Sequence, residues 1–198
     1  MNHFNRIGFW SALVAFISIV GFSVTQVLQL IGILSYPLDA ILIYGFSLFI
    51  TTPFMLALLA LHYMTPDEKK FWSGAALLFS VMYNIFVSIN YVVQLTVVIP
   101  LGVSELAQTP HSLYWTLDAL GYIYFGFATL FVIPVFKTQG LQKWLKMFLL
   151  ANFLITPLIA LVYFYPTFST TLLLLATPWL ITAPGSILFL ALYFRTKE

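Results

Sequence analysis

The sequence has few charged residues. Only 7% of its 198 residues are Asp, Glu, Lys or Arg, whereas 62% are hydrophobic. A soluble domain carries roughly 25% charged residues, so this chain lacks the side chains to cover a folded core with a surface that water solvates. The composition therefore predicts that a lipid bilayer surrounds the folded chain.

Cysteine is absent altogether, which excludes disulfides, thiolate metal sites and thiol nucleophiles. The histidines, His3, His62 and His111, are too dispersed to converge on a metal ion or a haem. The chain also lacks the phosphate-binding, dinucleotide-binding, zinc-protease and serine-hydrolase motifs. We therefore expect no metal and no cofactor, and the sequence leans against an enzyme without deciding the question.

Long apolar runs, by contrast, are abundant. A helix needs roughly 20 apolar residues to cross about 30 Å of hydrocarbon, and lipid offers no partner to a backbone group outside a helix. Six segments qualify, at residues 9–34, 37–63, 71–98, 113–136, 147–165 and 171–194. We predict an all-α, six-transmembrane-helix bundle that forms one transmembrane domain over residues 1–198.

Lys and Arg are absent from the loops between spans 1 and 2, 3 and 4, and 5 and 6. The eight basic residues fall in the two tails, the 2–3 loop and the 4–5 loop; they are Arg6, Lys69, Lys70, Lys137, Lys143, Lys146, Arg195 and Lys197. Six spans place these segments on one side, and cytoplasmic segments carry the excess of Lys and Arg. Both termini are thus predicted to be cytoplasmic. A net charge of only +2 makes nucleic acid an unexpected partner.

Polar side chains inside the spans are costly in a bilayer and need partners. One set falls at similar depth in the outward leaflet: Gln26, Gln29, Asp39, Asn90, Tyr91, Gln94, Asp118 and Tyr122. Asn90 and Gln94 are one helical turn apart, so both can face the same space. We expect the whole set to line one polar pocket that opens outward.

The two acids of this set differ. Asp39 follows Pro37 in the first turn of its span, where the helix dipole favours a carboxylate, so a structural role is favoured. Asp118 lies deeper, beyond Trp115, and has no Lys or Arg in its leaflet. It is either neutral, held by amide and tyrosine donors, or reached by water. Asp118 is the best site candidate, whereas Asn152 in the inner leaflet is expected only to bridge helices.

The sixth span contains Pro178, Pro184 and Gly185. Proline inside a helix frees a carbonyl group and bends or breaks the helix, so these residues predict a hinge. Broken helices mark binding sites in many transporters. The alternative is a static kink that improves packing.

The C-terminal part of the chain contains a series of short landmarks. In chain order they are Leu117–Tyr122 (LDALGY), Ala128–Phe131 (ATLF), Pro134–Phe136 (PVF), Leu150–Asn152 (LAN), Pro157, Thr182–Pro184 (TAP) and Tyr193–Arg195 (YFR). With these landmarks the stretch from Asp118 to Arg195 resembles small multi-span bacterial membrane proteins of unknown function. The resemblance implies a bacterial inner-membrane location and no particular activity.

Three functions fit the sequence. The favoured hypothesis is that the protein binds or transports a small neutral or amphipathic molecule, which includes lipid, through the outward-facing pocket. The first alternative is a non-catalytic accessory subunit that contacts another membrane protein or a second copy of itself. The second is a membrane enzyme that acts on lipid, for which Asp39 and Asp118 would have to reach one substrate.

Overall fold

The computed structural model describes residues 3–196, which are mostly helical and contain no strand within that range. Six helical segments in this range are long and apolar enough to cross a membrane. The prediction of an all-α bundle with six membrane-crossing helices is therefore confirmed. Lys197, one of the eight basic residues, lies outside the described range.

Short connections join the helices, which we number in chain order. The elements are α1 (His3–Leu30), α2 (Leu38–Met64), η1 (Asp67–Lys69), α3 (Lys70–Val93), η2 (Gln94–Val98), α4 (Ile99–Leu101), η3 (Ser104–Leu106), α5 (Leu113–Val132), η4 (Ile133–Val135), α6 (Gly140–Phe164), α7 (Thr170–Leu173), η5 (Leu174–Ala176) and α8 (Trp179–Arg195). The third span runs continuously from η1 to α4, and the sixth combines α7, η5 and α8.

Two spans begin earlier than the apolar runs suggest. α1 begins at His3 rather than at residue 9, and α6 begins at Gly140 rather than at residue 147. The α6 extension carries exposed polar side chains such as Lys143. A helix can continue beyond its apolar run in this way because long basic side chains reach water. α1 ends before Gly32, whose φ of 76° is a left-handed conformation that glycine favours.

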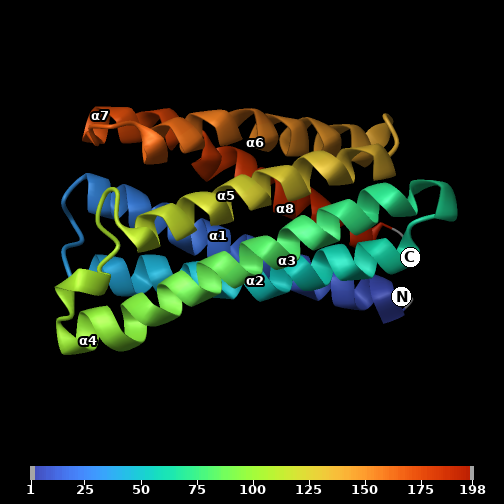
Figure 1. Ribbon diagram of the computed structural model, residues 1–198. Coiled ribbons are helices and arrows are strands. Elements are labelled where there is room, and N and C mark those ends of the chain that lie inside the picture. Colours follow the sequence, from blue (N-terminus) through green and yellow to red (C-terminus); the bar gives the residue numbers. More distant parts are fainter. Residues whose placement is uncertain (1–2, 197–198) are drawn as a thin grey trace.

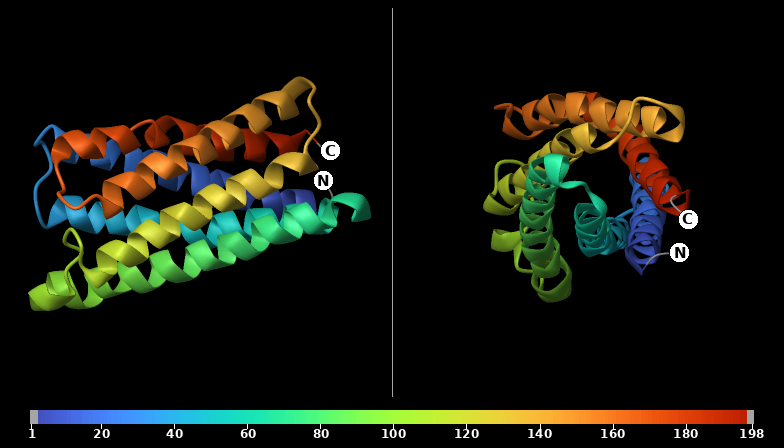
Figure 2. Two further views of the ribbon diagram at one scale, coloured as in Figure 1. Left: turned by 45° about the horizontal axis from the view of Figure 1, so that its top comes forward. Right: turned by 90° about the vertical axis from the view of Figure 1, so that its right-hand side faces the viewer.

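The six spans form a closed ring that follows the chain order (Figures 1 and 2). Each span packs against the next, in the sequence α1, α2, α3, α5, α6 and α8, and α8 returns to pack against α1. Both ends of the chain lie at the same end of this ring (Figure 1). Every helix therefore has two neighbours and presents one side to the centre and the other to lipid.

Aromatic rings fill the centre of the ring of helices. Phe125 of α5 contacts Phe54 of α2 and Tyr83 of α3, with ring centroids 4.7 Å and 5.1 Å away. Trp179 of α8 packs edge-on against Phe22 of α1 at 5.5 Å. All five side chains are at most 6% exposed. Edge-on and tilted contacts of this kind stabilise aromatic cores beyond the area that they bury.

Glycine lets α5 approach its neighbours closely. A Cβ atom at Gly126 would overlap the side chain of Thr156 on α6, and one at Gly121 would overlap Val87 on α3. Small residues at helix contacts are the usual means of close packing in membranes, where no hydrophobic force draws helices together. The middle of α5 is therefore fixed tightly on both sides.

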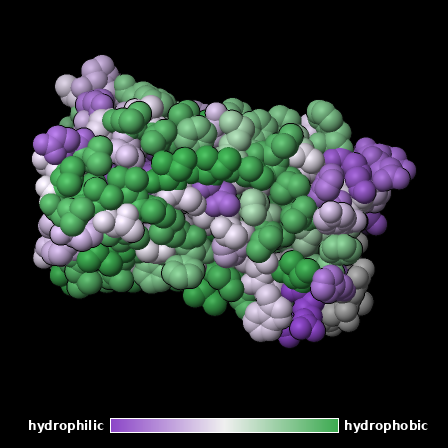
Figure 3. Space-filling model, turned by 60° about the horizontal axis from the view of Figure 1, so that its bottom comes forward, coloured by the Kyte–Doolittle hydropathy of each residue, from purple (hydrophilic) through white to green (hydrophobic). Residues whose placement is uncertain are grey.

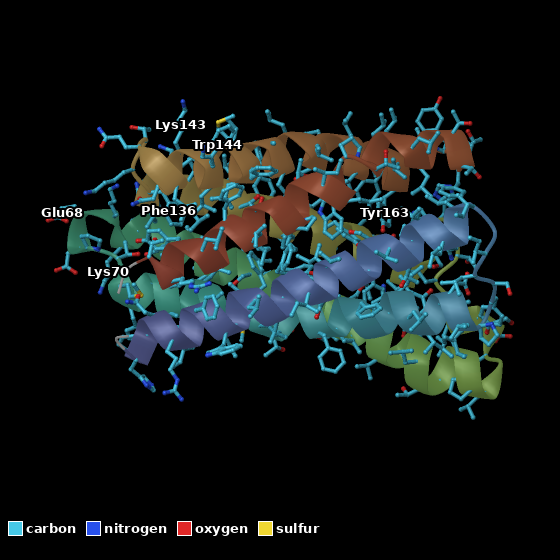
Figure 4. The ribbon with its side chains drawn as sticks, turned by 180° about the vertical axis from the view of Figure 1, so that it is seen from behind. Glu68, Lys70, Phe136, Lys143, Trp144 and Tyr163 are labelled. Carbon is cyan, nitrogen blue, oxygen red and sulfur yellow. The ribbon has the colours of Figure 1, made fainter. Side chains whose placement is uncertain are left out.

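The two ends of the bundle differ in charge. The basic end carries all the described Lys and Arg side chains, whereas the opposite end, which we call the acidic end, carries Asp39, Glu105 and Asp118. Lys70 and Lys143 lie at the basic end in Figure 4, far from Tyr163 near the acidic end. Figure 3 shows a hydrophobic band between the ends, with most hydrophilic colour at the basic end. This pattern suits a protein that crosses a bilayer.

The sixth span is interrupted at one of the two predicted places. The helix turns at Thr177 and Pro178, between η5 and α8. The expected break at Pro184 and Gly185 is wrong, because α8 is continuous through both residues. A Cβ atom at Gly185 would overlap the ring of Phe148 on α6, so α6 and α8 approach closely beside Pro184.

Candidate functional site

Asp118 is the centre of a polar network at the acidic end. It lies in the second turn of α5 and is only 2% exposed. Tyr91 of α3 donates its hydroxyl to Oδ1 at 2.6 Å. Oδ2 accepts from two groups, the Nε2 of Gln108 at 2.9 Å and the hydroxyl of Tyr163 on α6. The carboxyl group thus joins α3, α5, α6 and the loop before α5.

A π-helical turn at the end of α3 positions the loop side of this network. Pro100 lacks the N–H group that would continue the α-helical pattern, and over η2 the backbone widens so that Ile99 N–H donates to the carbonyl of Gln94. Such π turns are frequent at functional sites. The Gln94 side chain then holds the loop by donating to Leu106 O at 2.9 Å and accepting from the N–H of Gln108 at 3.1 Å.

Gln108 is held at both ends of its side-chain amide. Its Oε1 accepts from Asn90 Nδ2 at 3.0 Å, while its Nε2 donates to Asp118. Gln94 and Asn90 are 1% and 0% exposed, so α3 supplies two buried amides that fix one loop residue. The connection after α4 is therefore packed into the bundle by Gln108 and acts as a plug over Asp118.

Trp115 supports the opposite side of the network. Its Nε1 donates to the backbone carbonyl of Tyr163 at 2.9 Å, and the two rings lie 4.5 Å apart. Because Trp115 and Asp118 are three residues apart on α5, they face the same side of that helix. One turn of α5 therefore fixes both the backbone and the hydroxyl group of Tyr163.

Asp39 belongs to a second chain of hydrogen bonds. Gln26 Nε2 donates to Gln29 Oε1 at 2.8 Å, and Gln29 Nε2 donates to Asp39 Oδ2 at 2.7 Å. The Ala40 N–H donates to Oδ1 at 2.7 Å. Asp39 lies in the first turn of α2 and is 8% exposed, where free N–H groups and the helix dipole favour negative charge.

A cavity of about 410 Å³ lies at the acidic end, between the hydrogen-bonded pair Gln29 and Asp39 on one side and the loop residue Gln108 on the other. We call it the acidic-end cavity. Tyrosine rings and aliphatic side chains complete a wall whose polar members are Gln29, Asp39, Gln94, Ser104, Gln108 and Thr109. Its volume falls in the range of about 300–1,000 Å³ that is usual for small-molecule sites.

A smaller cavity of about 90 Å³ lies at the break in the sixth span. Phe22, Trp179 and several aliphatic side chains make most of its wall, and Gln26, Tyr122 and Tyr163 add polar groups. Tyr163 thus lines the small cavity, whereas Gln108 lines the acidic-end cavity. Since both donate to Oδ2 of Asp118, that one oxygen atom lies between the two cavities.

The prediction of a single pocket is wrong in its arrangement. Of the eight predicted residues, Gln29, Asp39 and Gln94 line the acidic-end cavity, while Gln26 and Tyr122 line the small one. The remaining three, Asn90, Tyr91 and Asp118, line neither and are at most 2% exposed. The reason is Gln108, whose side chain fills space that was expected to be open. That expectation came only from the positions of the polar residues along their spans. In this structure Asp118 is therefore closed off from the cavity that Asp39 lines.

Two residues of the network escaped the sequence analysis. Gln108 sits in a loop without periodicity, and Tyr163 lies near the end of a span, where tyrosine is common. Neither position carries a signal that distinguishes it from its neighbours. Trp179 did carry one, because it is a tryptophan away from the ends of a span, and the structure places it in the wall of the small cavity.

The fold and the site define the protein as a polytopic α-helical membrane protein with a polar cavity at the acidic end of its helical bundle. Comparison with protein-family models, with curated proteins and with solved structures finds no match to the chain. Among residues 3–196, no three His, Asp or Glu side chains lie close enough together to hold a metal ion.

Proposed function

We propose that this protein binds a small neutral or amphipathic molecule in the acidic-end cavity and carries it into or across the membrane. The observation that carries the proposal is the cavity itself, with about 410 Å³ of space walled by amide, hydroxyl, phenol and carboxyl groups. Polar groups are costly in a membrane bundle, and those that a bundle retains are therefore candidates for binding or transport. A bundle with a purely structural role has no need to keep such a volume open.

The contacts of Asp118 support transport rather than binding alone. Gln108 faces the cavity, and the Tyr163 hydroxyl beside the small cavity shares the same carboxylate oxygen with it. A ligand that takes over the hydrogen bond of Gln108 would release one donor from Asp118 and strengthen the bond from Tyr163. Binding at one cavity would thereby act on the wall of the other, next to the helix break at Pro178.

The acidic end faces the outside of the cell in this proposal, and both termini are cytoplasmic. Support comes from the basic end, because Lys and Arg mark the cytoplasmic side of membrane proteins. The resemblance of residues 118–195 to bacterial membrane proteins supports the bacterial inner membrane as the location. The ligand then enters the cavity from the periplasmic side.

Thermal unfolding of the detergent-purified protein, against a panel of neutral and amphipathic metabolites and lipids, tests the proposal. A ligand at 100 times its Kd stabilises the folded state by about 2.7 kcal/mol, which raises the unfolding temperature measurably. We expect a hit with the wild type and none with Ala107→Trp, which fills the cavity. Leu101→Trp is the matched control, since Leu101 is 70% exposed and is not in the cavity wall.

The two variants separate a cavity ligand from a surface one. A compound that stabilises wild type, Leu101→Trp and Ala107→Trp equally does not bind in the acidic-end cavity. A flat response of the wild type to every compound would overturn the proposal and favour an accessory subunit. Cross-linking in native membranes would then show whether the chain has a protein partner.

A further inference from the structure

The acidic end has carboxyl groups but no described Lys or Arg side chain to balance them. Asp39, Glu105 and Asp118 lie there, whereas every Lys and Arg between residues 3 and 196 lies at the opposite end. Among the described residues the one ion pair joins Lys70 to Asp67 at 3.7 Å, at the basic end. α5 alone has 20 residues, which separate the two ends by about 30 Å. Among residues 3–196 no Lys or Arg side chain is therefore close enough to neutralise this end, and His111 in the loop before α5 is its one histidine.

The partners of the two buried acids are all neutral. Asp39 accepts from Gln29 and a backbone N–H, and Asp118 accepts from two phenols and an amide. These donors satisfy hydrogen bonds but bring no positive charge to either carboxyl group. A buried charge is costly in a medium of low dielectric constant unless an opposite charge lies close by. A cation in the acidic-end cavity would supply that charge to Asp39, which lines it.

The wall of the acidic-end cavity also holds two tyrosine rings. Tyr36 and Tyr44 line the cavity together with Asp39. Tyr44 stacks on Tyr91 with ring centroids 4.9 Å apart, and Tyr91 donates to Asp118. Aromatic faces attract cations, most strongly where water is excluded. Asp118 thus lies behind these tyrosine rings, whereas Asp39 is itself part of the cavity wall.

We propose, building on the binding function above, that the ligand of the acidic-end cavity is an organic cation, namely a protonated or quaternary amine with an apolar body. The cavity wall contains one carboxyl group, that of Asp39, and aliphatic side chains such as Val98 and Ile99. Metal cations such as Ca²⁺ require six to eight oxygen ligands, several of them carboxylates. One carboxylate among phenols and aliphatic groups fits an alkylammonium ion instead.

Choline and 3,3-dimethylbutan-1-ol are a matched pair of probes, because they share one shape and differ in the positive charge. Isothermal titration of each into the full-length protein in a neutral detergent measures the effect of charge alone. We expect choline to bind at least about tenfold more tightly than the neutral alcohol, a difference of about 1.4 kcal/mol. Equal binding, or tighter binding of the alcohol, would overturn the organic-cation proposal while the proposed binding function stands.

Variants locate the charge effect. Asp39→Asn should weaken choline binding about tenfold or more and leave the binding of the neutral alcohol within about twofold. Glu105→Gln removes the same charge at the same end from a residue outside the cavity wall, so screening by salt should hold its effect on choline below about twofold. An equal loss in both variants would contradict a site at Asp39.

Tyr36→Leu provides a test that does not alter a buried group, since Tyr36 is 66% exposed. It should weaken choline binding severalfold, because its ring is part of the cavity wall and would contact the ammonium group, and unchanged binding would count against the organic-cation proposal. If Asp39→Asn does not fold, this variant and the wild-type comparison of the two probes decide the matter. Binding of neither probe, together with a neutral hit from the panel, would overturn the organic-cation proposal alone. Failure of both probes and of the whole panel would overturn the binding function as well.

Discussion

In the middle of α6, Asn152 connects three helices through neutral groups. Its Nδ2 donates to Thr129 on α5 at 3.2 Å, and its Oδ1 accepts from Thr182 on α8 at 3.3 Å. Asp118 at the acidic end also connects several helices, but through a carboxyl group beside two cavities. Both side chains are buried. An amide bridge suffices to hold helices together, so the carboxyl group and the open volume at the acidic end require another reason, which we take to be ligand binding.

The largest effect on stability should come from Asp118→Ala. This change leaves two phenol groups and one amide of the network without their acceptor, and each buried donor without a partner costs about 1–3 kcal/mol. We expect the free energy of unfolding to fall by about 3 kcal/mol or more, measured by SDS titration of the protein in mixed micelles and followed by circular dichroism. Asp118→Asn keeps the shape and one acceptor, and should lose less.

A value for Asp118→Ala within about 0.5 kcal/mol of the wild type would contradict the network. It would mean that the donors of Tyr91, Tyr163 and Gln108 find other partners, and that Asp118 does not hold the acidic end together.

Gly126→Ala should have the next largest effect. The new methyl group overlaps Thr156, which itself bonds to the helix backbone of α6, so α5 and α6 must move apart. We expect a loss of about 1–3 kcal/mol in the same unfolding assay. Gly45→Ala is the control, because a Cβ atom at Gly45 meets nothing within 4 Å.

If the two glycine substitutions have equal effects, the close contact between α5 and α6 is not what stabilises the middle of the bundle. The contrast between a tightly packed middle and an open acidic end would then lose its physical basis.

The smallest of the three effects is expected for Asn152→Ala. Hydrogen bonds between membrane helices contribute about 0.6 kcal/mol each on average, and this change removes two that are long. A loss of about 1 kcal/mol, measured as above, would agree with a simple bridge. A loss as large as that for Asp118→Ala would remove the distinction between the two polar centres.

The helices and the two charged ends follow directly from the sequence, because apolar runs and the positions of Lys and Arg are properties of single segments. The bridging role of Asn152 was also predictable, since a lone amide in a span needs a partner. The burial of Asp118 was not predictable, because it depends on Gln108, a residue of an irregular loop, and on Tyr163, which lies 45 residues further along the chain. Nor does the sequence distinguish Pro178 from Pro184: the helix is interrupted at Pro178 and continues through Pro184, although either proline could have interrupted it.

Cysteine labelling in membrane vesicles tests most directly whether a water-filled cavity lies at the end of the bundle opposite the basic side chains. The chain has no cysteine, so each introduced thiol is the single target of a charged, membrane-impermeant thiol reagent. Ala40→Cys, in the cavity wall, should react only from the face opposite to the one that labels Lys143→Cys, and Ala128→Cys, which is 0% exposed, should not react. Labelling of Ala40→Cys from the same face as Lys143→Cys, or no labelling of it from either face, would contradict the account.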